Sequence, residues 1–586
     1  MASSSRIANK LPLEMLYHWE RQCPDRTYLR QTINREYVDF TWGEVADEAR
    51  RMVTALRHLG LVAGDKVALL SKNCAQWFIA DLAMQMGQYV SVPIYPTANV
   101  DTIEYVLRHS EAKAIFVGKL DDWKSQEAGV PADLLRIAFP YDTMPASHQW
   151  DDLLEAHEPI PDSPVQAPDS LLSLVYTSGS TGKPKGAMLS VERYAWSCEK
   201  LVETVSLSQA DRGFSYLPLA HITERVYIYG GSLYGGATIA FPESLDTFIE
   251  DVKRCRPTVF ISVPRLWAMF RIKIHEKLPQ KKLELLLKIP LISGLIKRKL
   301  QKGLGLDQAR VLGCGSAPVS PALLEWYLSI GLKVTEAWGM TENHAYSTIN
   351  YPFRADKIGT VGKAGIGVTI KISDEGEILC RCEGMMLGYY KDPEHSAEAI
   401  DAEGWLHTGD MGKLDKEGYL TITGRMKDVF KTAKGKYVAP VPIEGLLGQE
   451  PIIEQLCVIG YGMPQPIALV QLAESAMKGN REEVNARLEA ARVRVNDQLE
   501  SHAKIRGILV VKTPWNIENG VLTPTMKIKR HLLEQKYAQV GIAGPHPRWW
   551  CGRSKSRLSI AQQTTTALDG PLLCLRHITR RCFVGE

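Results

Sequence analysis

Apolar and polar positions along the first 120 residues follow two different periods. The segment 41–60 has apolar side chains at helical spacing, begins with the capping sequence Thr41-Trp-Gly-Glu44 and ends at Gly60, which predicts an amphipathic helix. By the same reasoning, strands are predicted at 66–70, 89–94 and 114–117, and further helices at 74–86 and 101–108. This βαβα order predicts parallel sheets with helices on both faces.

The last third of the chain contains a second, smaller set of elements. A helix is predicted near 481–500 and strands near 505–512, which are enough for a small α/β domain. The final residues, 541–586, have no clear periodicity and carry seven basic residues against two acidic ones. We expect this tail to be disordered and dispensable for activity.

Residues 271–302 combine helical spacing of leucine and isoleucine with strong positive charge. Ten basic residues stand against the two acids Glu276 and Glu284, and Pro290 divides the segment. The pattern predicts two short amphipathic helices with basic faces. Such a surface suits an anionic membrane, or equally a solvated helix pair over the N-terminal core, and both interpretations stay open.

Composition agrees with a multidomain protein of ordinary type. Of 586 residues, 45% are hydrophobic and 23% charged, with a formal net charge of +4. No run approaches the length of a transmembrane helix, and the start, Met1–Arg6, lacks the apolar core of a signal peptide. Eleven cysteines without zinc-type spacing fit reduced thiols, so we expect a cytoplasmic protein.

A run of glycines, hydroxyl side chains and lysines directly follows the apolar stretch 170–175. Residues 176–188 read Tyr-Thr-Ser-Gly-Ser-Thr-Gly-Lys-Pro-Lys-Gly-Ala-Met. Glycines let backbone N–H groups turn toward an anion, hydroxyl groups add donors, and Lys183 and Lys185 add positive charge. The segment therefore predicts a phosphate-binding loop.

Two other interpretations of this loop fit less well. A Walker A loop needs four residues before its Gly-Lys pair, whereas two separate Gly179 from Gly182, and Pro184 stands where Ser or Thr would hold magnesium. A surface linker of serine and glycine rarely carries a Lys-Pro-Lys-Gly end directly after a buried strand.

Five further segments, in a fixed order, complete a resemblance to the adenylate-forming (AMP-binding) superfamily. They are Gly315-Ser-Ala-Pro318, Glu336-Ala-Trp-Gly-Met-Thr-Glu342, Gly404-Trp-Leu-His-Thr-Gly-Asp410, Gly424-Arg-Met-Lys-Asp428 and Leu522-Thr-Pro-Thr-Met-Lys-Ile-Lys-Arg530. Each segment alone has an ordinary structural explanation, but their joint order does not. Over residues 10–540 the chain is most similar to long-chain fatty acid–CoA ligases (acyl-CoA synthetases).

The resemblance implies an α/β fold with two domains. Residues 1–424 would form an AMP-binding domain of parallel and mixed sheets sandwiched by helices, with a small β-barrel-like subdomain. Residues 425–540 would form a small, mobile C-terminal α/β domain that carries the catalytic lysine. The tail, 541–586, lies outside the resemblance, and whether the protein forms a homodimer stays open.

The implied reaction is the activation of a carboxylic acid by ATP. The carboxylate attacks the α-phosphate and expels pyrophosphate, and it needs no general base because it is already ionised at neutral pH. The transition state needs positive charge near the α-phosphoryl oxygens and the leaving pyrophosphate. By resemblance, Lys527, Glu342, Thr341 and Arg425 serve catalysis, and Thr177 and Glu342 hold Mg²⁺.

The resemblance also assigns nucleotide contacts. The loop would grip the β- and γ-phosphates, Asp410 would accept hydrogen bonds from the ribose hydroxyls, and Trp338 would stack on the adenine. The implied nucleotide-binding residues are Thr177, Ser178, Gly179, Ser180, Thr181, Gly182, Lys185, Gly315, Ala317, Pro318, Ala337, Trp338, Gly339, Met340, Thr341, Asp410 and Arg425.

A second half-reaction transfers the acyl group to the thiol of coenzyme A. In the family the C-terminal domain swings around a hinge between the half-reactions, and Lys427 matches the hinge position. The segment after it departs from the commoner Gly-Gly-Glu pattern. The residues assigned to the acyl and CoA region are His221, Lys431, Lys434, Gly435 and Lys436. An exposed basic loop without a partner is the alternative for the lysines.

The substrate class rests on residues 217–225, Leu-Pro-Leu-Ala-His-Ile-Thr-Glu-Arg. They resemble the Leu-Pro-Leu-x-His stretch of long-chain fatty acyl-CoA synthetases, with His221 near the carboxylate. Glu224 is the only acid there, and the adjacent Arg225 indicates a local ion pair instead of a free carboxylate for an amino-acid ammonium group. Glycines from 230 to 236 either leave room for an alkyl tunnel or permit close packing.

The sequence therefore predicts an AMP-forming ligase that joins a long-chain fatty acid to CoA, with ATP and Mg²⁺ as cofactors. Two alternatives stay open: a fatty acyl-AMP ligase that serves a carrier protein, and a non-catalytic acyl- or nucleotide-binding protein at membranes. The expected partners are the fatty acid and, through residues 271–302, the inner face of an anionic membrane. No nucleic-acid partner is expected.

Overall fold

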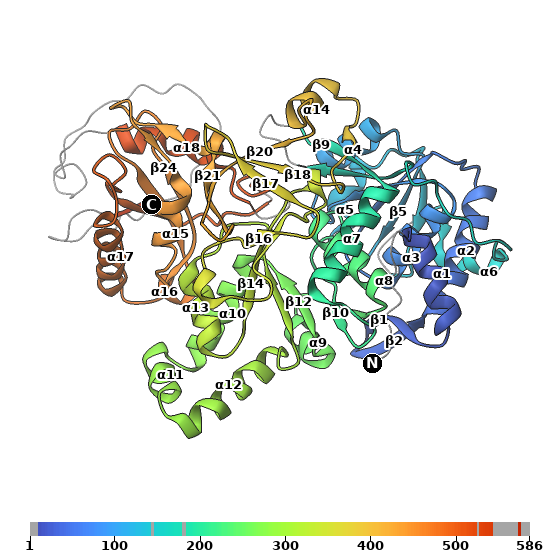
Figure 1. Ribbon diagram of the computed structural model, residues 1–586, viewed down its shortest axis with the longest axis horizontal. Helices are drawn as coiled ribbons and strands as arrows, with labels where there is room; N and C mark the ends of the chain where they lie inside the picture. Colours follow the sequence, from blue (N-terminus) through green and yellow to red (C-terminus); the bar gives the residue numbers. More distant parts are fainter. Residues whose placement is uncertain are drawn as a thin grey trace.

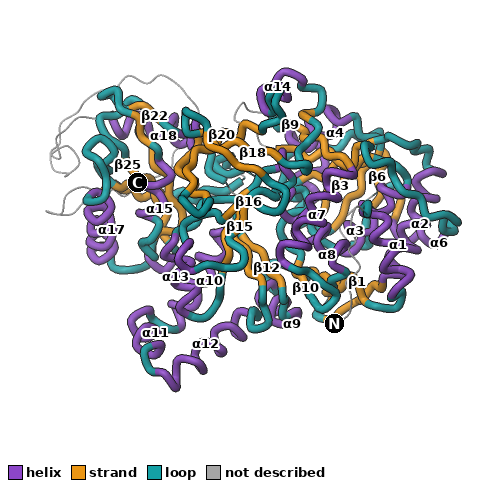
Figure 2. The backbone as a smooth tube through the Cα atoms, in the orientation of Figure 1, coloured by secondary structure: helices purple, strands orange, loops and turns teal. Residues whose placement is uncertain are grey.

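The structure, a computed structural model, describes residues 10–141, 146–177, 183–517, 519–523, 527–542 and 572–575. A large N-terminal lobe is followed by a smaller C-terminal lobe with a sheet of its own (Figure 1). Helices lie around and between the strands of the N-terminal lobe (Figure 2). Among the described residues, no helix is both long and apolar enough to cross a lipid bilayer.

The first large sheet has nine strands in the order β16-β15-β14-β13-β12-β10-β11-β1-β2. The bounds are β1 Thr27–Ile33, β2 Glu36–Thr41, β10 Arg212–Phe214, β11 Thr238–Phe241, β12 Val259–Ser262, β13 Val311–Cys314, β14 Val334–Trp338, β15 Thr348–Ile349 and β16 Lys363–Ala364. The central strands are parallel. Because of this, β12, β13 and β14 end at the same edge of the sheet.

The second large sheet has eight strands in the order β19-β9-β8-β4-β3-β5-β6-β7. The bounds are β3 Lys66–Ser71, β4 Val90–Ile94, β5 Ala114–Gly118, β6 Leu135–Ala138, β7 His148–Gln149, β8 Leu171–Thr177, β9 Lys185–Ser190 and β19 Gly388–Tyr389. Strands β3 to β8 pair in parallel, whereas β8 and β9 form an antiparallel hairpin. The predicted phosphate loop connects these two strands in the sequence.

Helix α3 (Ala75–Met86) lies between the two large sheets. All of its residues are buried, and it contacts β1 of the first sheet and both β3 and β4 of the second. Nine of its twelve residues are apolar and they lie on every side of the helix, which explains this position. Other N-terminal helices are α1 Pro12–Gln22, α2 Trp42–His58, α4 Val100–Ser110, α5 Trp123–Gln126, α6 Trp150–Ala156, α7 Val191–Val205, α8 Gly231–Gly235, α9 Phe248–Cys255, α13 Pro321–Ser329 and α14 Pro393–Ala399.

The elements predicted in the first 120 residues are confirmed. The helix predicted over 41–60 is α2, and both bonds of its capping box form, from Glu44 N to Thr41 Oγ1 at 3.2 Å and from Thr41 N to Glu44 Oε2 at 2.7 Å. The predicted strands correspond to β3, β4 and β5, and the other helices to α3 and α4. Local pattern was sufficient here because α2 and α4 each have one apolar face, whereas α3, β4 and β5 are short, mostly apolar runs.

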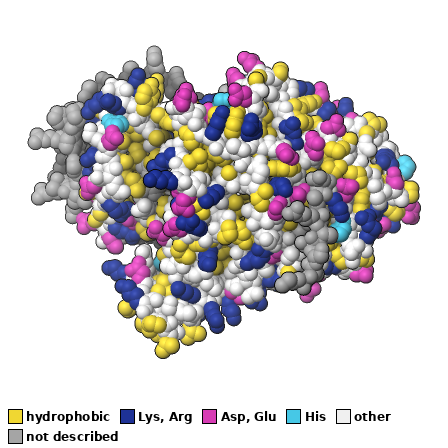
Figure 3. Space-filling view, in the orientation of Figure 1, with side chains coloured by type: hydrophobic (Ala, Val, Ile, Leu, Met, Phe, Trp, Pro, Cys, Tyr) yellow, Lys and Arg dark blue, Asp and Glu magenta, His cyan; other side chains and the backbone are white. Residues whose placement is uncertain are grey.

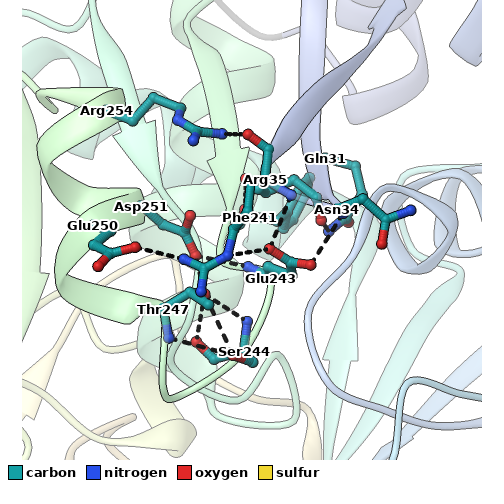
Figure 4. Close-up of polar contacts among 11 residues, drawn as sticks. Gln31, Asn34, Arg35, Phe241, Glu243, Ser244, Thr247, Glu250, Asp251 and Arg254 are labelled. Atoms are coloured by element: carbon teal, nitrogen blue, oxygen red, sulfur yellow. Dashed lines mark hydrogen bonds and ion pairs between the residues drawn. The ribbon is translucent and has the colours of Figure 1, made fainter.

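A polar network fastens the β1–β2 hairpin to the loop before α9 (Figure 4). Asn34 and Arg35 form the hairpin turn with positive φ, and their N–H groups donate to the Glu243 carboxylate at 3.0 and 3.2 Å. Arg35 also pairs with Glu250, and Arg254 donates to the Arg35 carbonyl oxygen. The edge hairpin is thereby held to the parallel part of the nine-stranded sheet.

A buried ion pair joins α3 to the π-helix η2 (Glu224–Gly230). Arg225 donates to Asp81 at 3.1 Å, and both side chains are fully buried. Glu224 instead accepts hydrogen bonds from Ser215 at 2.7 Å and from the Tyr216 N–H at 3.1 Å. The expected ion pair between Glu224 and Arg225 is wrong, because consecutive residues of a helix do not face each other.

A four-stranded antiparallel sheet corresponds to the expected β-barrel-like subdomain. Its strands, β17 Thr369–Ile372, β18 Glu377–Arg381, β20 Leu406–Leu414 and β21 Leu420–Arg425, form an open row in the order β17-β18-β20-β21. The pairing of β20 with β21 sets Asp410 opposite Arg425. The last residue of β21 is thus the first residue of the predicted C-terminal domain.

The C-terminal lobe begins with a short hairpin, β22 (Phe430–Lys431) and β23 (Tyr437–Val438). Its other elements are α15 Pro440–Leu447, β24 Ile453–Ile459, β25 Ile467–Leu472, α16 Glu474–Met477, α17 Arg481–Asn496, β26 Ile508–Val511, α18 Arg530–Ile542 and β27 Leu572–Leu575. Helix α17 and strand β26 match the helix and strand predicted there. Most of the tail, 541–586, lies outside the described residues; 541–542 end α18, and β27 pairs with β26.

The basic segment 271–302 forms three helical pieces. It comprises the end of α10 (Pro264–Lys277), the whole of α11 (Gln280–Leu287) and most of α12 (Pro290–Leu304). Pro290 separates two helices as predicted, since proline is tolerated in the first turn of a helix. The break near Pro279, which divides α10 from α11, was not predicted.

Candidate functional site

The carboxyl ends of three parallel strands form one side of a cleft. Ser262 at the end of β12, Cys314 at the end of β13 and Trp338 at the end of β14 line it, together with Gly315 and Ser316. The empty volume of the cleft, including the part that is open to solvent, is about 690 Å³. Ligands of open α/β sheets bind at this type of edge, because the loops after the strands converge there.

Gly315, Ala337, Trp338 and Gly339 of the predicted adenine site therefore lie together. A Cβ atom on Gly315 would lie 2.9 Å from the Ala337 carbonyl oxygen, so the two strand ends approach too closely for a larger residue. Ala317 and Pro318 follow in the chain and are exposed. Met340 instead packs against an apolar cluster that contains Cys380, Met385 and Leu406.

Asp410 is held by two donors beside the cleft. The Trp338 indole Nε1 donates to its Oδ2 at 2.9 Å, and Arg425 Nε donates to its Oδ1 at 3.0 Å. Asp410 is 7% exposed. Each carboxylate oxygen has a second lone pair, so the group can still accept hydrogen bonds from two adjacent hydroxyl groups of a ligand.

Glu342 lies in the 3₁₀-helix η3 (Thr341–Asn343) directly after this edge and is buried. Its Oε1 accepts a hydrogen bond from the Tyr389 hydroxyl group at 2.7 Å. The Lys185 ammonium group lies 5.2 Å from the centre of the Tyr389 ring. Tyr389 thus connects the acidic group to the end of the phosphate loop.

Sequence reasoning missed Tyr389, because a tyrosine in Gly388-Tyr-Tyr390 has no chemical signature of its own. The antiparallel pairing of β19 with β9, which sets Tyr389 opposite Ala187, brings it to the site. Burial and the Glu342 carboxylate raise the pKa of its phenol. The hydroxyl group therefore stays a hydrogen-bond donor at neutral pH.

Thr177 ends β8, and its backbone pairs with Lys185 at the start of β9. Its hydroxyl group reaches the Lys185 carbonyl oxygen at 3.5 Å. The predicted loop residues Ser178, Gly179, Ser180, Thr181 and Gly182 lie outside the described residues. The two ends of the predicted phosphate loop are thus placed on the same side as Tyr389 and Glu342.

Lys527 belongs to the C-terminal lobe, and its ammonium group lies near Arg425, Asp410 and Glu342. Burial and the nearby Arg425 lower the pKa of its ammonium group to about 8, and Asp410 and Glu342 partly oppose that shift. Two hydrogen bonds close the turn that presents it, from Lys527 N to Thr523 Oγ1 at 3.0 Å and from Thr523 N to the Lys527 carbonyl oxygen at 2.8 Å.

His221 shares the environment of Lys527. Burial and the lysine charge lower the pKa of the imidazole to about 3, so the ring is neutral at physiological pH. Its Nδ1 accepts a hydrogen bond from the Thr223 N–H at 3.2 Å, and the Thr223 hydroxyl group lies 3.4 Å from that of Ser316. His221 is therefore connected to the cleft through Thr223 and Ser316.

The lobes also meet through Arg265 of α10 and Glu454 of β24, whose side chains are 3.2 Å apart. Lys427 lies in the 3₁₀-helix η5 (Met426–Asp428), directly after β21, where the chain passes from one lobe to the other. A hinge at this point would move Lys527 relative to the cleft. In this structure Lys527 of the C-terminal lobe lies near Asp410 and Glu342 of the N-terminal lobe.

The β22–β23 hairpin lies outside the group around Lys527. The side chains of Lys431, Lys434 and Lys436 are exposed, and Gly435 has a φ of 75° in the turn. Within the described part of the chain, neither Lys434 nor Lys436 makes a side-chain polar contact with the cleft. These predicted CoA residues are therefore not brought together with His221 here.

Away from the strand ends, the cleft is apolar. The aliphatic residues that line it are Leu201, Val205, Leu207, Leu217, Val259, Ile261, Val311 and Ile349. A second cavity, with an empty volume of about 220 Å³, shares Leu207, Tyr227 and Val259 with the first. The two spaces are thus neighbours with a common wall.

The donor set suits Mg²⁺ bound together with a polyphosphate. Glu342 Oε2 has no hydrogen-bond partner among the described residues, and Thr177 supplies a hydroxyl oxygen. Mg²⁺ is commonly bound by one or two carboxylates plus substrate phosphates and water. No cluster of three His, Cys, Asp or Glu side chains occurs in the described residues, so a protein-only metal cage is absent there.

Family comparisons match nearly the whole chain. Residues 16–390 match the family described as "AMP-binding enzyme", and residues 427–540 match "AMP-binding enzyme C-terminal domain". The long-chain-fatty-acid–CoA ligase FadD15 of Mycobacterium bovis is 30% identical over 580 residues, which cover 89% of this chain and 95% of that protein. The long-chain-fatty-acid–CoA ligase ACSBG2 of Xenopus laevis is 31% identical, with coverages of 86% and 79%.

Solved structures with the same fold include an anthranilate ligase and a carboxylic acid reductase domain. The anthranilate CoA ligase AuaEII, in complex with anthranoyl-AMP, has a TM-score of 0.74 and 21% identity, covering 92% of this chain and 99% of its own. The A domain of carboxylic acid reductase from Segniliparus rugosus, in complex with AMP and a carboxylic acid, has a TM-score of 0.75 and 20% identity, with coverages of 90% and 93%. At these identities the likeness concerns the fold.

Proposed function

The chain belongs to the AMP-binding enzyme family, and from this premise we propose that it is an AMP-forming ligase for long-chain fatty acids and coenzyme A. The acid would first become an acyl-AMP, with release of pyrophosphate, and the acyl group would then pass to the CoA thiol. The observation that carries the choice of acid is the apolar cleft that starts at Ser316 and Trp338 and adjoins a second cavity.

The lining of the cleft favours a hydrocarbon chain over a charged substrate. The polar groups in the main cleft are neutral, and the one acid of the adjoining cavity, Asp211, is 3% exposed and paired with Arg310 at 2.6 Å. A buried charge needs a partner, and the cleft offers no free carboxylate to an ammonium group. Apolar surface removed from water contributes about 25 cal/mol per Å², so binding energy should increase with chain length.

In the first half-reaction we assign roles to four side chains, those of Lys527, Glu342, Thr177 and Asp410. His221 is neutral and lies near Lys527, so the charge opposite the reacting centre comes from the lysine. Lys527 would stabilise the negative charge that develops on the α-phosphoryl oxygens. Mg²⁺, held by Glu342 and Thr177 with phosphate oxygens, would neutralise charge on the pyrophosphate. Asp410 would fix the ribose.

The test is CoA-dependent release of AMP across a panel of acids from acetate to oleate, with anthranilate included. We expect kcat/KM to rise with the chain length of the acid, because each added methylene group contacts more of the apolar lining of the cleft. The Leu207→Trp variant, which enlarges the wall between the two cavities, should lose long acids selectively and keep short ones. Leu245→Trp, at a position that is 77% exposed, is the matched control.

Two results would overturn this assignment. The first is a higher kcat/KM for the aryl acid than for any aliphatic acid. The second is a chain-length profile that Leu207→Trp leaves unchanged although the variant is folded. Absence of pyrophosphate exchange with every acid would instead favour a non-catalytic binding protein.

Coenzyme A is favoured as the acceptor over a carrier protein by one feature. Lys431, Lys434 and Lys436 stand exposed on the hairpin that follows the hinge, and such a group of ammonium charges suits the phosphates of a nucleotide-bearing thiol. Thioester formation with free CoA and no carrier protein would support this choice. Release of acyl-AMP in the presence of CoA, with no thioester, would favour a fatty acyl-AMP ligase.

A further inference from the structure

Helices α11 and α12 form a hairpin, here called the basic hairpin (residues 280–304), whose outer surface is apolar near its turn. The exposed fractions are 63% for Leu285, 40% for Ile289, 89% for Leu291, 37% for Ile292 and 68% for Leu295. Large aliphatic side chains are rarely grouped and exposed on a monomeric protein without a partner. These five residues lie within eleven positions of each other on the two helices.

The apolar residues that anchor the hairpin are different ones. Leu283 and Leu304 are 1% and 6% exposed and pack in the cluster of Trp267, Phe270 and Tyr327. Leu287, Ile296 and Leu300 are partly buried against the same cluster. The hairpin is therefore fixed to the lobe by one set of side chains, and the outer set is not needed for its attachment.

Positive charge surrounds the outer apolar set. The basic hairpin carries seven basic residues and one acid, Glu284, which accepts a hydrogen bond from Gln280 at 2.9 Å. The exposed basic residues are Lys281, Lys282, Lys288, Arg298, Lys299 and Lys302. Among the described residues, none of the six forms an ion pair.

The hairpin projects from the lower side of the N-terminal lobe, away from both lobes (Figure 1). In the space-filling view its end is hydrophobic, with Lys and Arg side chains beside and above it (Figure 3). A flat surface can therefore touch this end without meeting the rest of the molecule first.

We propose that the basic hairpin docks on an anionic lipid surface. Its outer leucines and isoleucines would enter the boundary between head groups and acyl chains, while its lysines and arginine contact the lipid phosphates and carboxylates. A second copy of the chain fits this surface less well, because a two-fold dimer would place the same unpaired positive charges against each other. The proposal does not depend on which acid the enzyme activates.

The experiment is flotation of the full chain with vesicles of phosphatidylcholine and phosphatidylserine, and with vesicles of phosphatidylcholine alone. We expect binding to the anionic vesicles at low salt, weaker binding at moderate salt because the charges are screened, and little binding to neutral vesicles. Equal binding to both vesicle types, or none to the anionic ones at low salt, would overturn the proposal.

Two double variants separate the contributions of charge and apolar contact. Arg298→Gln with Lys299→Gln should lower the partition coefficient about thirtyfold, and Leu291→Ser with Leu295→Ser should lower it at least as much. The matched controls are Lys113→Gln with Lys124→Gln and Val62→Ser with Leu245→Ser, at exposed positions elsewhere. If the controls reduce binding as strongly as the hairpin variants, the docking surface is not this one.

Light scattering in the absence of lipid tests the alternative that a second copy of the chain binds the basic hairpin. We expect the mass of the protein to be the same for the wild type and for Leu291→Ser with Leu295→Ser. A dimer that this variant dissociates would assign the surface to a second copy and overturn the lipid proposal. Because vesicle binding needs neither acid nor nucleotide, its failure is distinguishable from a failure of the proposed enzymatic function.

Discussion

Lys527 is subject to two opposing electrostatic influences. Burial and the guanidinium group of Arg425 disfavour its charge, while Asp410 and Glu342 favour it, and the resulting pKa is about 8. The role that we propose for Lys527, stabilising a phosphoryl transition state, needs the ammonium form, which predominates below this pKa. An ordinary surface lysine would stay charged about two pH units higher.

The first prediction concerns the pH dependence of adenylation. In the free enzyme Lys527 is protonated below about pH 8 and loses its charge above it. We therefore expect kcat/KM for ATP in pyrophosphate exchange to fall about tenfold per pH unit above that value, since kcat/KM reports groups of the free enzyme. Lys527→Arg should remove this fall, because arginine stays protonated.

A profile that stays level to pH 9.5 in the wild type would contradict this assignment. Lys529→Arg, two residues further along the chain, serves as the control and should keep the wild-type profile.

The second prediction concerns Tyr389. Tyr389→Phe removes the hydrogen bond to Glu342 Oε1, which is 2.7 Å long in the structure, and frees the carboxylate to rotate. A hydrogen bond to a charged group is worth about 1.5–3 kcal/mol, so we expect kcat/KM for magnesium–ATP to fall by about ten- to a hundredfold. Steady-state kinetics at varied Mg²⁺ concentration measure the effect.

Tyr390→Phe is the matched control for this change. The Tyr390 hydroxyl group donates to Glu111 at an exposed position, 3.1 Å away, and has no contact with Glu342. Equal losses in the two variants would show that Tyr389 does not act through the Glu342 carboxylate.

At the scale of elements, helix α3 and the π-helix η2 are joined by the buried pair of Asp81 and Arg225. Arg225 donates to both carboxylate oxygens, at 3.1 and 3.4 Å, and its guanidinium group lies 5.3 Å from the Trp77 ring. Among the residues that the structure describes, its Nε and Nη1 have no hydrogen-bond partner. The arginine therefore depends on Asp81 for nearly all of its charge compensation.

The third prediction follows from that dependence. Asp81→Asn leaves a buried, uncompensated guanidinium group, which typically costs about 3–5 kcal/mol of stability. We expect a lower midpoint of urea unfolding for the N-terminal lobe, followed by tryptophan fluorescence. Asp47→Asn, which breaks the partly exposed pair with Arg51, should change stability by less than about 1 kcal/mol. Similar shifts for both variants would refute the argument.

At the scale of the whole molecule, the arrangement of the two lobes fits the first half-reaction of the proposed mechanism. Lys527 lies near Asp410 and Glu342, the pair of Arg265 and Glu454 spans the lobes, and the lysines of the β22–β23 hairpin are exposed. In the proposed mechanism the thiol acceptor needs a different arrangement, in which Lys527 is withdrawn from Asp410 and Glu342. Lys427, at the chain crossing between the lobes, is the point about which we propose this change.

The fourth prediction separates the two half-reactions. Lys434→Ala with Lys436→Ala should raise KM for CoA several-fold, since two ammonium contacts to phosphate are lost, and leave pyrophosphate exchange unchanged. Thioester formation at varied CoA concentration measures the first effect. An unchanged KM would remove the CoA role of these lysines, and a loss of exchange would place them in the first half-reaction.

Much of the fold and the general chemistry followed from the sequence alone. The capping box of α2, the alternation of short strands and helices, and the six segments that resemble the AMP-binding family are local features of the chain, so the sequence alone reveals them. What it could not supply is the partner of each side chain. Arg225 pairs with Asp81, 144 positions away, and not with its neighbour Glu224.

Tertiary structure alone decided the composition of the site. Tyr389 reaches Glu342 because β19 pairs with β9, and Leu207, Tyr227 and Val259 divide two cavities because loop, helix and strand converge there. It also separated the leucines of the basic hairpin into an anchoring set and an exposed set, which share one helical spacing in the sequence. Residue types and their order determine which chemistry is available, whereas distances and burial arise only when distant segments pack together.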